Sequence, residues 1–211
     1  MENPVIILGA QKLGVAALDA FSSNNVVVYC FLEDDATLQQ KEVNEIAVMG
    51  STEEEEILRI LGKKCEVFVA TEDAASRKSL TNMLKEKYQA VPVNAIHKFS
   101  YVSEQAWLGH GNLVGAGAVV NPNSKLGDNC IIQARAVIDT GAELADFVQV
   151  APGAIINTDV KIGEAAYVGT GAIVVSGIKI GKKARIGAGS LVVSDVADGQ
   201  TVFGNPAQPV K

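Results

Sequence analysis

The sequence predicts two parts, a Rossmann-like α/β domain over residues 1–96 and an all-β left-handed parallel β-helix over residues 97–211. Two observations predict this division. Short apolar runs alternate with helical patterns in the first part, and from Val102 onward an aliphatic residue recurs at every sixth position. The composition agrees, because 48% hydrophobic residues allow a packed core, while 20 glycines and only 5% aromatic residues indicate many tight turns.

The first part reads as buried strands separated by helices. Strands are expected at residues 5–8, 26–31, 46–48 and 67–70, and helices at residues 12–21, from Ser51 onward and at residues 73–88. Continuous apolar strands that alternate with helices predict a parallel sheet.

Ligands of parallel sheets bind beyond the carboxyl ends of the strands. This rule places residues 9–12, 33–35 and 71–72 around one crevice, with Gly9, Gln11, Lys12, Asp34 and Asp35 as candidate substrate ligands. The first turn lacks a complete G-x-G-x-x-G, so a nucleotide site and a simple tight turn both remain open. The acidic run either hydrogen-bonds a ribose or base, or forms a solvated loop.

The second part repeats in hexads without interruption. A small or β-branched residue lies four positions after nearly every aliphatic one, and glycine often follows the aliphatic one directly. Each hexad forms one short strand and a turn, and three hexads close a triangular coil that stacks on the previous coil. The sixteen aliphatic positions are Val102, Leu108, Val114, Val120, Leu126, Ile132, Ile138, Leu144, Val150, Ile156, Ile162, Val168, Val174, Ile180, Ile186 and Val192.

The three faces of the β-helix differ in the residues that point outward. Positions eighteen apart stack on one face, and the residue before each aliphatic one points out. The second face carries Trp107, Lys125, Glu143, Lys161 and Lys179, which predicts a solvated surface, and the third carries Leu113, Ile131, Gln149, Tyr167 and Arg185. The first face is apolar and predicts a subunit interface with cyclic closure, through Tyr101, Val119, Val137, Ile155, Ile173 and Leu191.

Several classes of protein are excluded or disfavoured. A net charge of −6 argues against nucleic acid as a general partner. No apolar run approaches the ~20 residues of a membrane span, and Met1-Glu2-Asn3-Pro4 has no basic region typical of a secretory signal. Cys30, Cys65 and Cys130 lack metal-ligand spacing and are expected to be buried or free thiols. We therefore expect a cytoplasmic protein without a metal.

Hexads followed by residues 202–207, Val-Phe-Gly-Asn-Pro-Ala, resemble the hexapeptide acyltransferases. With the α/β domain in front, the chain resembles sugar O-/N-acetyltransferases of the sialic-acid and bacillosamine type. Comparable residues in that family fall at Ile7-Leu8-Gly9-Ala10, Phe31-Leu32-Glu33-Asp34-Asp35, Val48-Met49-Gly50, Arg77 and Ile96-His97. The resemblance implies a homotrimer, acetyl-CoA in a groove between neighbouring β-helices, and a nucleotide-linked amino sugar as acceptor. It also implies CoA contacts at Gln149, Thr158, Thr170, Ala188, Asn205 and Pro206, with Thr158, Thr170 and Ala188 along one corner.

The chain departs from the family at two places. Gln11-Lys12-Leu13 stands where the family has a second glycine and a histidine. Thr140, after Asp139, replaces the histidine that serves as general base, and Gln149 replaces a second histidine. His97 and His110 are expected to be structural.

The missing base favours an amine over a hydroxyl as acceptor. A neutral amine already has a lone pair and loses its proton after attack, so Asp139, water or bulk solvent can accept that proton. The resemblance also implies that the backbone N–H of Thr158, at the position of the family's oxyanion donor, stabilises the oxyanion. The sequence thus predicts an N-acetyltransferase for surface polysaccharide or glycan synthesis, with Asp139 and Thr140 in the catalytic site. The alternative is a catalytically inactive trimeric binding or scaffold protein, and acetylation of serine or another small metabolite fits the α/β domain less well.

Overall fold

The chain forms two compact units, Met1–Lys98 and Phe99–Lys211. The computed structural model describes residues 3–210. Met1 and Glu2, which belong to the N-terminal stretch considered above for a secretory signal, and Lys211 lie outside the described residues. Within residues 3–210, none of the helices combines the length and the apolar character that crossing a membrane requires.

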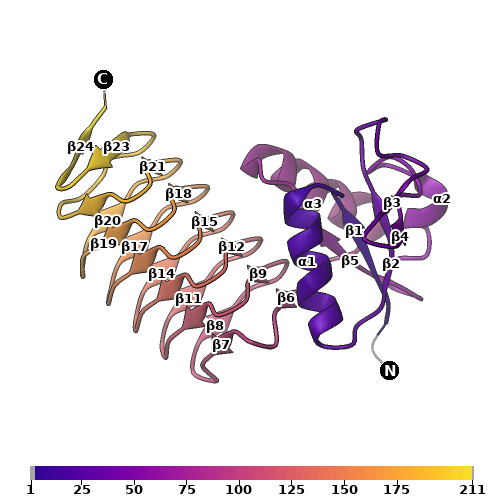
Figure 1. Ribbon diagram of the computed structural model, residues 1–211, viewed down its shortest axis with the longest axis horizontal. Helices are drawn as coiled ribbons and strands as arrows, with labels where there is room; N and C mark the ends of the chain where they lie inside the picture. The colour runs from indigo at the N-terminus through magenta and orange to yellow at the C-terminus, as the bar shows by residue number, and fades with distance from the viewer. Residues whose placement is uncertain (1–2, 211) are drawn as a thin grey trace. The chain divides into compact units, whose positions relative to one another are not determined.

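The first unit is built on a parallel three-stranded sheet (Figure 1). β1 (Val5–Leu8) lies between β2 (Val28–Leu32) and β5 (Glu66–Val69), and both neighbours run parallel to it. α1 (Lys12–Ser23) follows β1, and α3 (Ala74–Tyr88) follows β5. These strands and helices confirm the predicted alternation, and the buried strands supply much of the apolar core of this unit.

The segment between β2 and β5 differs from the prediction in two ways. Instead of one more parallel strand at residues 46–48, β3 (Glu42–Val43) and β4 (Ile46–Ala47) form an antiparallel hairpin, and only Val48 bridges to β2. The hairpin arises because Asn44 and Glu45 both adopt positive φ, which reverses the chain tightly. The expected capped helix from Ser51 is also wrong. α2 (Glu55–Leu58) is one turn without a side-chain cap. Further along the chain, α3 is followed by the short strand β6 (Ala95–Ile96).

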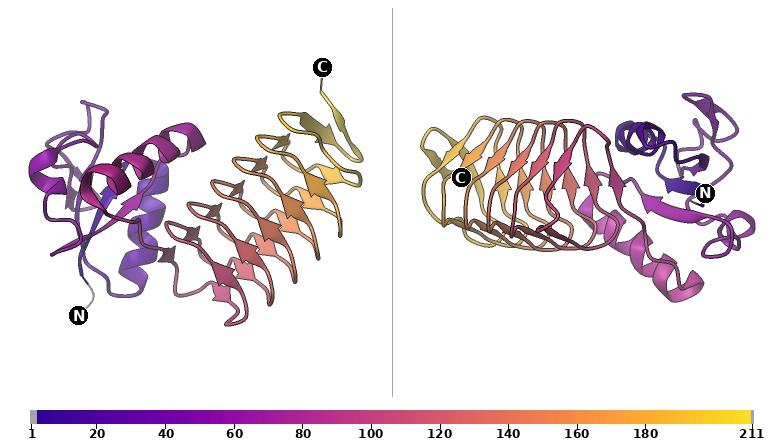
Figure 2. Two further views of the ribbon diagram at one scale, coloured as in Figure 1. Left: turned by 180° about the vertical axis from the view of Figure 1, so that it is seen from behind. Right: turned by 90° about the horizontal axis from the view of Figure 1, so that it is seen from below.

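The second unit is a parallel β-solenoid with three strands per coil, as the hexads predict (Figure 2). Each predicted aliphatic residue is the second residue of a two-residue strand, and strands eighteen residues apart pair in parallel. The strands are β7 (Tyr101–Val102), β8 (Trp107–Leu108), β9 (Leu113–Val114), β10 (Val119–Val120), β11 (Lys125–Leu126), β12 (Ile131–Ile132), β13 (Val137–Ile138), β14 (Glu143–Leu144), β15 (Gln149–Val150), β16 (Ile155–Ile156), β17 (Lys161–Ile162), β18 (Tyr167–Val168), β19 (Ile173–Val174), β20 (Lys179–Ile180), β21 (Arg185–Ile186) and β22 (Leu191–Val192).

The corners of the coils share one backbone conformation. The residue three positions after each aliphatic one has positive φ at fourteen successive corners, from Gly111 to Gly189. Glycine and asparagine take up this left-handed conformation easily, whereas other residues pay about 1–2 kcal/mol. Arg135, Phe147 and Ala165 nevertheless adopt it, because the register of the coil dictates the turn.

The three faces have the characters that the sequence predicts, with one difference. The first is apolar, and Tyr101 and Ile173 on it are exposed. On the second, Glu143 pairs with Lys125 at 3.7 Å and with Lys161 at 3.6 Å. The difference is on the third face, where the outward-pointing Leu113 and Ile131 are both only 1% exposed.

A hairpin covers the C-terminal end of the solenoid. β23 (Thr201–Gly204) pairs in parallel with β21, and β24 (Ala207–Pro209) returns antiparallel to β23. The hairpin continues the third face for one more strand, so the last coil does not present a bare edge there.

We expect Gly169→Ala to destabilise the second unit by about 3 kcal/mol, the upper range for overpacking. A Cβ at this position would lie 2.6 Å from the backbone N of Ala188 in the next coil, which cannot move away. Urea unfolding followed by circular dichroism measures the change. Gly171→Ala is the matched control, because it has open space and only its positive φ, so it should cost about 1 kcal/mol. Equal losses for the two variants would show that coil stacking is not the constraint.

Candidate functional site

A cavity of about 510 Å³ lies in the first unit beyond the carboxyl ends of β1, β2 and β5. It is the crevice that the sequence predicts, and Gly9, Gln11 and Asp34 line it. Lys12 and Asp35 are not among the residues that line it. The complete lining is Gly9, Gln11, Leu13, Glu33, Asp34, Thr52, Glu53, Ala70, Thr71, Glu72, Asp73, Ser76, Ser79 and Leu80.

The acidic run at the end of β2 is held by hydrogen bonds. The buried Glu33 carboxylate accepts the Ala10 N–H at 2.9 Å and the Asp35 N–H at 3.1 Å. Asp34 accepts the Thr52 N–H at 2.8 Å and the Thr52 hydroxyl, so Thr52 orders this loop rather than capping a helix. Asp35 accepts the N–H and the hydroxyl of Thr37, and these bonds lower its pKa. The loop is therefore ordered, and Asp34 is the member of the run that both lines the cavity and is exposed.

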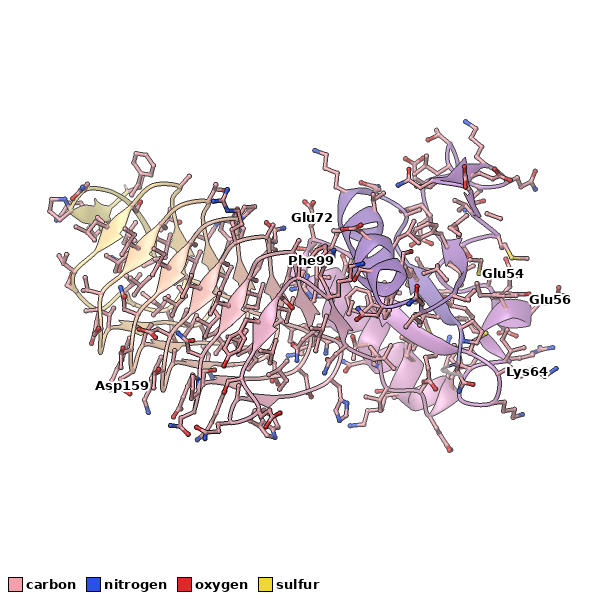
Figure 3. All side chains as sticks on the ribbon, turned by 60° about the horizontal axis from the view of Figure 1, so that its bottom comes forward. Glu54, Glu56, Lys64, Glu72, Phe99 and Asp159 are labelled. Carbon is pink, nitrogen blue, oxygen red and sulfur yellow. The ribbon has the colours of Figure 1, made fainter. Side chains whose placement is uncertain are left out.

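The opposite wall of the cavity is fixed by a buried arginine. Arg77 of α3 is 1% exposed, and its Nη1 donates to the carbonyl oxygens of Thr71 at 2.5 Å and Glu72 at 3.2 Å. The Thr71 hydroxyl oxygen is buried and has no hydrogen-bond partner among the described residues. Glu72 points outward beside it (Figure 3). A buried hydroxyl that lacks a hydrogen-bond partner in a cavity wall can form a hydrogen bond with a polar atom of a ligand. Thr71 is therefore a candidate ligand-binding residue. In the sequence its only sign is that it directly follows a predicted strand.

Lining residues give the cavity a negative character. Five carboxylates and no lysine or arginine are among its described lining residues. The N-terminus of α1 lies at the cavity, since its N-cap residue Gln11 lines it, and Gln11 makes no side-chain cap. Backbone N–H groups there suit an anion, whereas the carboxylates suit the donor groups of a base or a ribose.

The second cluster of candidates lies on the solenoid, around Asp139. Asp139 follows β13 and is half-buried. Its carboxylate accepts from the Thr140 N–H at 2.8 Å, from Asn121 Nδ2 at 2.9 Å and from the Thr158 hydroxyl at 2.9 Å. These hydrogen bonds, the Thr140 N–H first, lower the pKa of Asp139. Their stabilisation of the fold is therefore present above the ordinary pKa of an aspartate and is lost as pH falls through the lowered one.

The amide groups next to Asp139 differ in their hydrogen bonding. The Thr140 N–H is used by Asp139, whereas the Thr158 N–H has no acceptor among the described residues. Thr158 is half-buried, and its N–H is available to bind an oxyanion. Asn121 and the Thr158 hydroxyl were not predicted as site residues, although Asn121 lies eighteen residues before Asp139 and so stacks directly on it.

The predicted CoA residues lie on two corners rather than one. Thr140 and Thr158 stack on one corner, since Asp159 N donates to Thr140 O at 3.2 Å. Thr170 and Ala188 stack on another, since Gly189 N donates to Thr170 O at 2.8 Å. The prediction of a single corner for Thr158, Thr170 and Ala188 is therefore wrong. Stacking requires separations of eighteen residues, and Thr158 and Thr170 are twelve apart. The two corners flank the apolar first face.

The remaining predicted residues lie near these corners or on the third face. Gln149 points outward from β15, half-buried between Ile131 and Tyr167. Asn205 and Pro206 form the exposed turn between β23 and β24. Like the Thr158 N–H, the N–H groups of Thr170 and Ala188 have no acceptor among the described residues, so they can donate to the carbonyl oxygens of a ligand.

One aromatic residue near this turn was not predicted. The ring of Phe203 lies over Gly187, at a place that a Cβ on Gly187 would occupy, and Phe203 is 57% exposed. Gly187 adjoins Ala188, so the ring lies at the C-terminal end of that corner. An exposed ring held on the backbone is a stacking surface for a flat heterocycle.

Neither histidine lies in these clusters. His97 is buried, with Nε2 3.3 Å from Asp19 Oδ2. His110 is exposed, and its backbone N–H donates to Asp128. The three cysteines are free and buried, as predicted, and burial raises the pKa of Cys30 to about 12. Among the described residues no group of three His, Cys, Asp or Glu side chains is placed to hold a metal ion.

Comparison with known proteins places the chain in a family. The protein family described as bacterial transferase hexapeptide (six repeats) matches residues 105–140. The acetyltransferase domain of PglB from Neisseria gonorrhoeae, solved with acetyl coenzyme A, is 30% identical over 100% of both chains, with a TM-score of 0.92. The chain belongs to the hexapeptide-repeat sugar acetyltransferases of the left-handed β-helix family.

Two further structures extend this likeness. A variant of perosamine N-acetyltransferase from Caulobacter crescentus, solved with CoA and GDP-perosamine, is 29% identical, with a TM-score of 0.92 over 100% of this chain and 98% of that chain. WeeI from Acinetobacter baumannii has the same fold, with 24% identity, a TM-score of 0.88 and coverage of 98% and 99%. No curated protein matches the sequence.

Proposed function

We propose that this protein transfers the acetyl group of acetyl-CoA to the amine of a nucleotide-linked amino sugar, in the synthesis of a surface polysaccharide or other glycan. The observation that carries the proposal is the uncommitted Thr158 N–H beside the anchored carboxylate of Asp139. Structures similar to this chain over its whole length hold acetyl-CoA, or CoA with GDP-perosamine. These relatives are acetyltransferases, so they lend no support to a non-catalytic scaffold.

The residue at the position of the base decides between nitrogen and oxygen acceptors. Thr140 is exposed and offers no group that is basic near neutral pH. A hydroxyl acceptor would lose the ~10²–10⁴-fold contribution of a positioned base. An amine attacks through its own lone pair, so N-acetylation is the reaction that suits this corner.

The acceptor and the donor would occupy different places in the chain. The nucleotide would lie in the cavity of the first unit as in a Rossmann-like domain, with its base or ribose on Asp34 and Thr71 and its phosphates at Gly9, Gln11 and Lys12. The acetyl group would lie at Thr158. Both substrates are metabolites of the cytoplasm, where we place the reaction.

We propose a homotrimer because the donor groups lie on the two corners that flank the apolar first face. Packing that face against a neighbouring chain would bring the corner of Thr140 and Thr158 toward the neighbour's corner of Thr170 and Ala188. The pantetheine arm of CoA would then run between the two chains, with Gln149 and Asn205-Pro206 toward its outer end.

Ligand-dependent thermal unfolding tests the proposed substrates. A ligand that binds the folded chain raises apparent stability by RT ln(1 + [L]/Kd), about 2.7 kcal/mol at a hundredfold excess over Kd. Acetyl-CoA and GDP- or UDP-linked 4-amino sugars should each raise Tm, and CoA should be released when both are present. No shift with acetyl-CoA, or a shift without CoA release from any amine, would contradict the proposal.

We expect Phe203→Ala to weaken acetyl-CoA binding by about tenfold, the loss of one aromatic stacking contact. The ring lies over Gly187, further toward the C-terminal end of the solenoid than Thr158. It can therefore stack on the adenine of CoA, which lies at the far end of the pantetheine arm. Acetyl-pantetheine, which has no adenine, should bind wild type and variant equally. Trp107→Ala removes an equally exposed ring, 58% against 57%, from the second face and serves as the control. Equal affinity of Phe203→Ala and wild type for acetyl-CoA would remove Phe203 from the site.

A further inference from the structure

The Asp139 carboxylate is held by donors from three successive coils. Asn121 lies one coil before it, Thr140 follows it, and Thr158 lies one coil after it. Oδ1 accepts two of these hydrogen bonds and Oδ2 accepts one, from the Thr158 hydroxyl. An ionised carboxylate offers about four lone-pair sites. Oδ2, with one of these three bonds, is the oxygen with room for a further donor.

A carboxylate held in this way is a fixed anion and a weak base. Its hydrogen bonds favour the charged form and lower its pKa, so it takes up protons poorly near neutral pH. Its direct partners, an amide, a hydroxyl and a backbone N–H, are all neutral. It therefore keeps its full negative charge for a cation from outside the chain.

Thr158 places two different groups at this point of the corner. Its hydroxyl binds Oδ2 of Asp139, and its backbone N–H has no acceptor among the described residues. An ammonium on the free site of Oδ2 would thus lie within one residue of a donor for the thioester oxygen. A hydroxyl acceptor carries no charge and gains much less from Oδ2.

We propose that Asn121 and Thr158 are positioning residues that aim Oδ2 of Asp139 at the acceptor, which binds as a primary alkylammonium ion. This inference rests on the proposed function and assigns Asp139 to binding the acceptor rather than to removing its proton. It also supplies a reason for the chain to retain the aspartate where the histidine base is replaced by Thr140.

The chemistry balances without a side-chain base. The bound ammonium releases one proton to water, and the resulting amine forms a bond to the carbonyl carbon of acetyl-CoA. The oxyanion accepts the Thr158 N–H. Collapse breaks the carbon–sulfur bond, and the CoA thiolate takes the second proton from nitrogen. The products are the amide, CoA as its thiol, and one proton in solvent.

The test compares affinities for an amine and for its hydroxyl counterpart. GDP- and UDP-linked 4-amino sugars and the same nucleotide sugars with a hydroxyl at carbon 4 are titrated calorimetrically, and the pair with the tightest amine is used. The wild type should bind the amine about 10–100-fold more tightly, as expected for a hydrogen bond to a charged group. Asp139→Asn should bring the ratio of the two affinities close to one, with acetyl-CoA affinity unchanged.

Two further variants separate positioning from general effects. Thr158→Val removes the hydroxyl that holds Oδ2 and should lower the affinity ratio several-fold, whereas Thr158→Ser should retain it. Asp159→Asn is the control for charge, because Asp159 lies in the same corner, projects into solvent (Figure 3) and is exposed. Its left-handed φ of 59° suits asparagine equally well.

The outcomes distinguish this inference from the proposed function. If neither amino sugar binds the wild type, the proposed function fails and the inference fails with it. If an amino sugar binds and is acetylated, but Asp139→Asn keeps the wild-type ratio, only the inference is overturned. A loss of the ratio in Asp159→Asn as large as in Asp139→Asn would also overturn it, since the effect would then reflect net charge alone.

Discussion

Replacing Thr140 by histidine should open the protein to hydroxyl acceptors, with acetyl transfer to them faster by about 10²–10⁴-fold. Thr140 is exposed at the corner beside Asp139, so an imidazole fits there without displacing the core. The new base would accept the hydroxyl proton, and its rate contribution should rise with pH through about 6.5, the ordinary pKa of histidine. Amine acetylation should change much less, because water takes the proton of the ammonium and the resulting amine attacks without a side-chain base.

Steady-state kinetics with amino and hydroxy nucleotide sugars measures this change. Thr140→Asn is the matched control, since asparagine is polar but not basic at these pH values. Robust acetylation of a hydroxyl by the wild type would contradict the assignment of Thr140 to a vacated base position. A Thr140→His variant that binds both substrates but acetylates hydroxyl acceptors no faster than the wild type would also contradict it.

Placing a charge on the apolar first face should abolish both assembly and activity. Ile155 lies in β16 with Val137 and Ile173 as its neighbours in register, at the centre of that face. Burial of an unpaired carboxylate costs several kcal/mol, so Ile155→Glu should release single chains of 22.1 kDa from the trimer. Acetyl transfer should be lost with it, because the proposed donor site takes one corner from each of two chains.

Sedimentation velocity with a parallel CoA-release assay measures this result. Lys179→Glu places the same residue on the solvated second face and should leave both trimer and activity intact. A monomeric wild type would contradict the proposed assembly, and so would an Ile155→Glu variant that remains trimeric and active.

The solenoid could be predicted almost residue by residue because every hexad meets the same environment. An aliphatic residue such as Ile156 is buried wherever the period places it, and its neighbours eighteen residues away pair with it. The conformation of the corners was less predictable. Phe147 and Arg135 have little preference for positive φ, and they adopt it because the coil imposes the turn.

The first unit was predictable where apolar strands are long and less so where segments are short. The segment at residues 46–48 carries the same residue types as a parallel strand, yet the turn at Asn44-Glu45 folds it into a hairpin. Thr52 has the residue type of a helix cap, but the nearby Asp34 carboxylate competes for its hydroxyl and N–H. A local turn decided the first outcome, and a contact between segments decided the second.

Part of the site was already encoded in the repeat. Asn121 and Asp139 differ by eighteen residues, so their contact follows from the period alone. The contact of Thr158 with Asp139 needs the direction of both side chains around a corner, which the period does not specify. Nor does it specify the Phe203 ring over Gly187, because the C-terminal hairpin is outside the repeat.

The central claim is amine acetylation without a histidine base, and product analysis tests it most directly. The wild type is incubated with acetyl-CoA and, in separate reactions, with GDP- and UDP-linked 4-amino sugars and their 4-hydroxy counterparts, and the products are identified by mass spectrometry. We expect a gain of one acetyl group on an amino sugar, with one CoA released per acetyl group, and no product from any hydroxy sugar. An acetylated hydroxy sugar, or no acetylated amine despite binding of acetyl-CoA, would contradict the account.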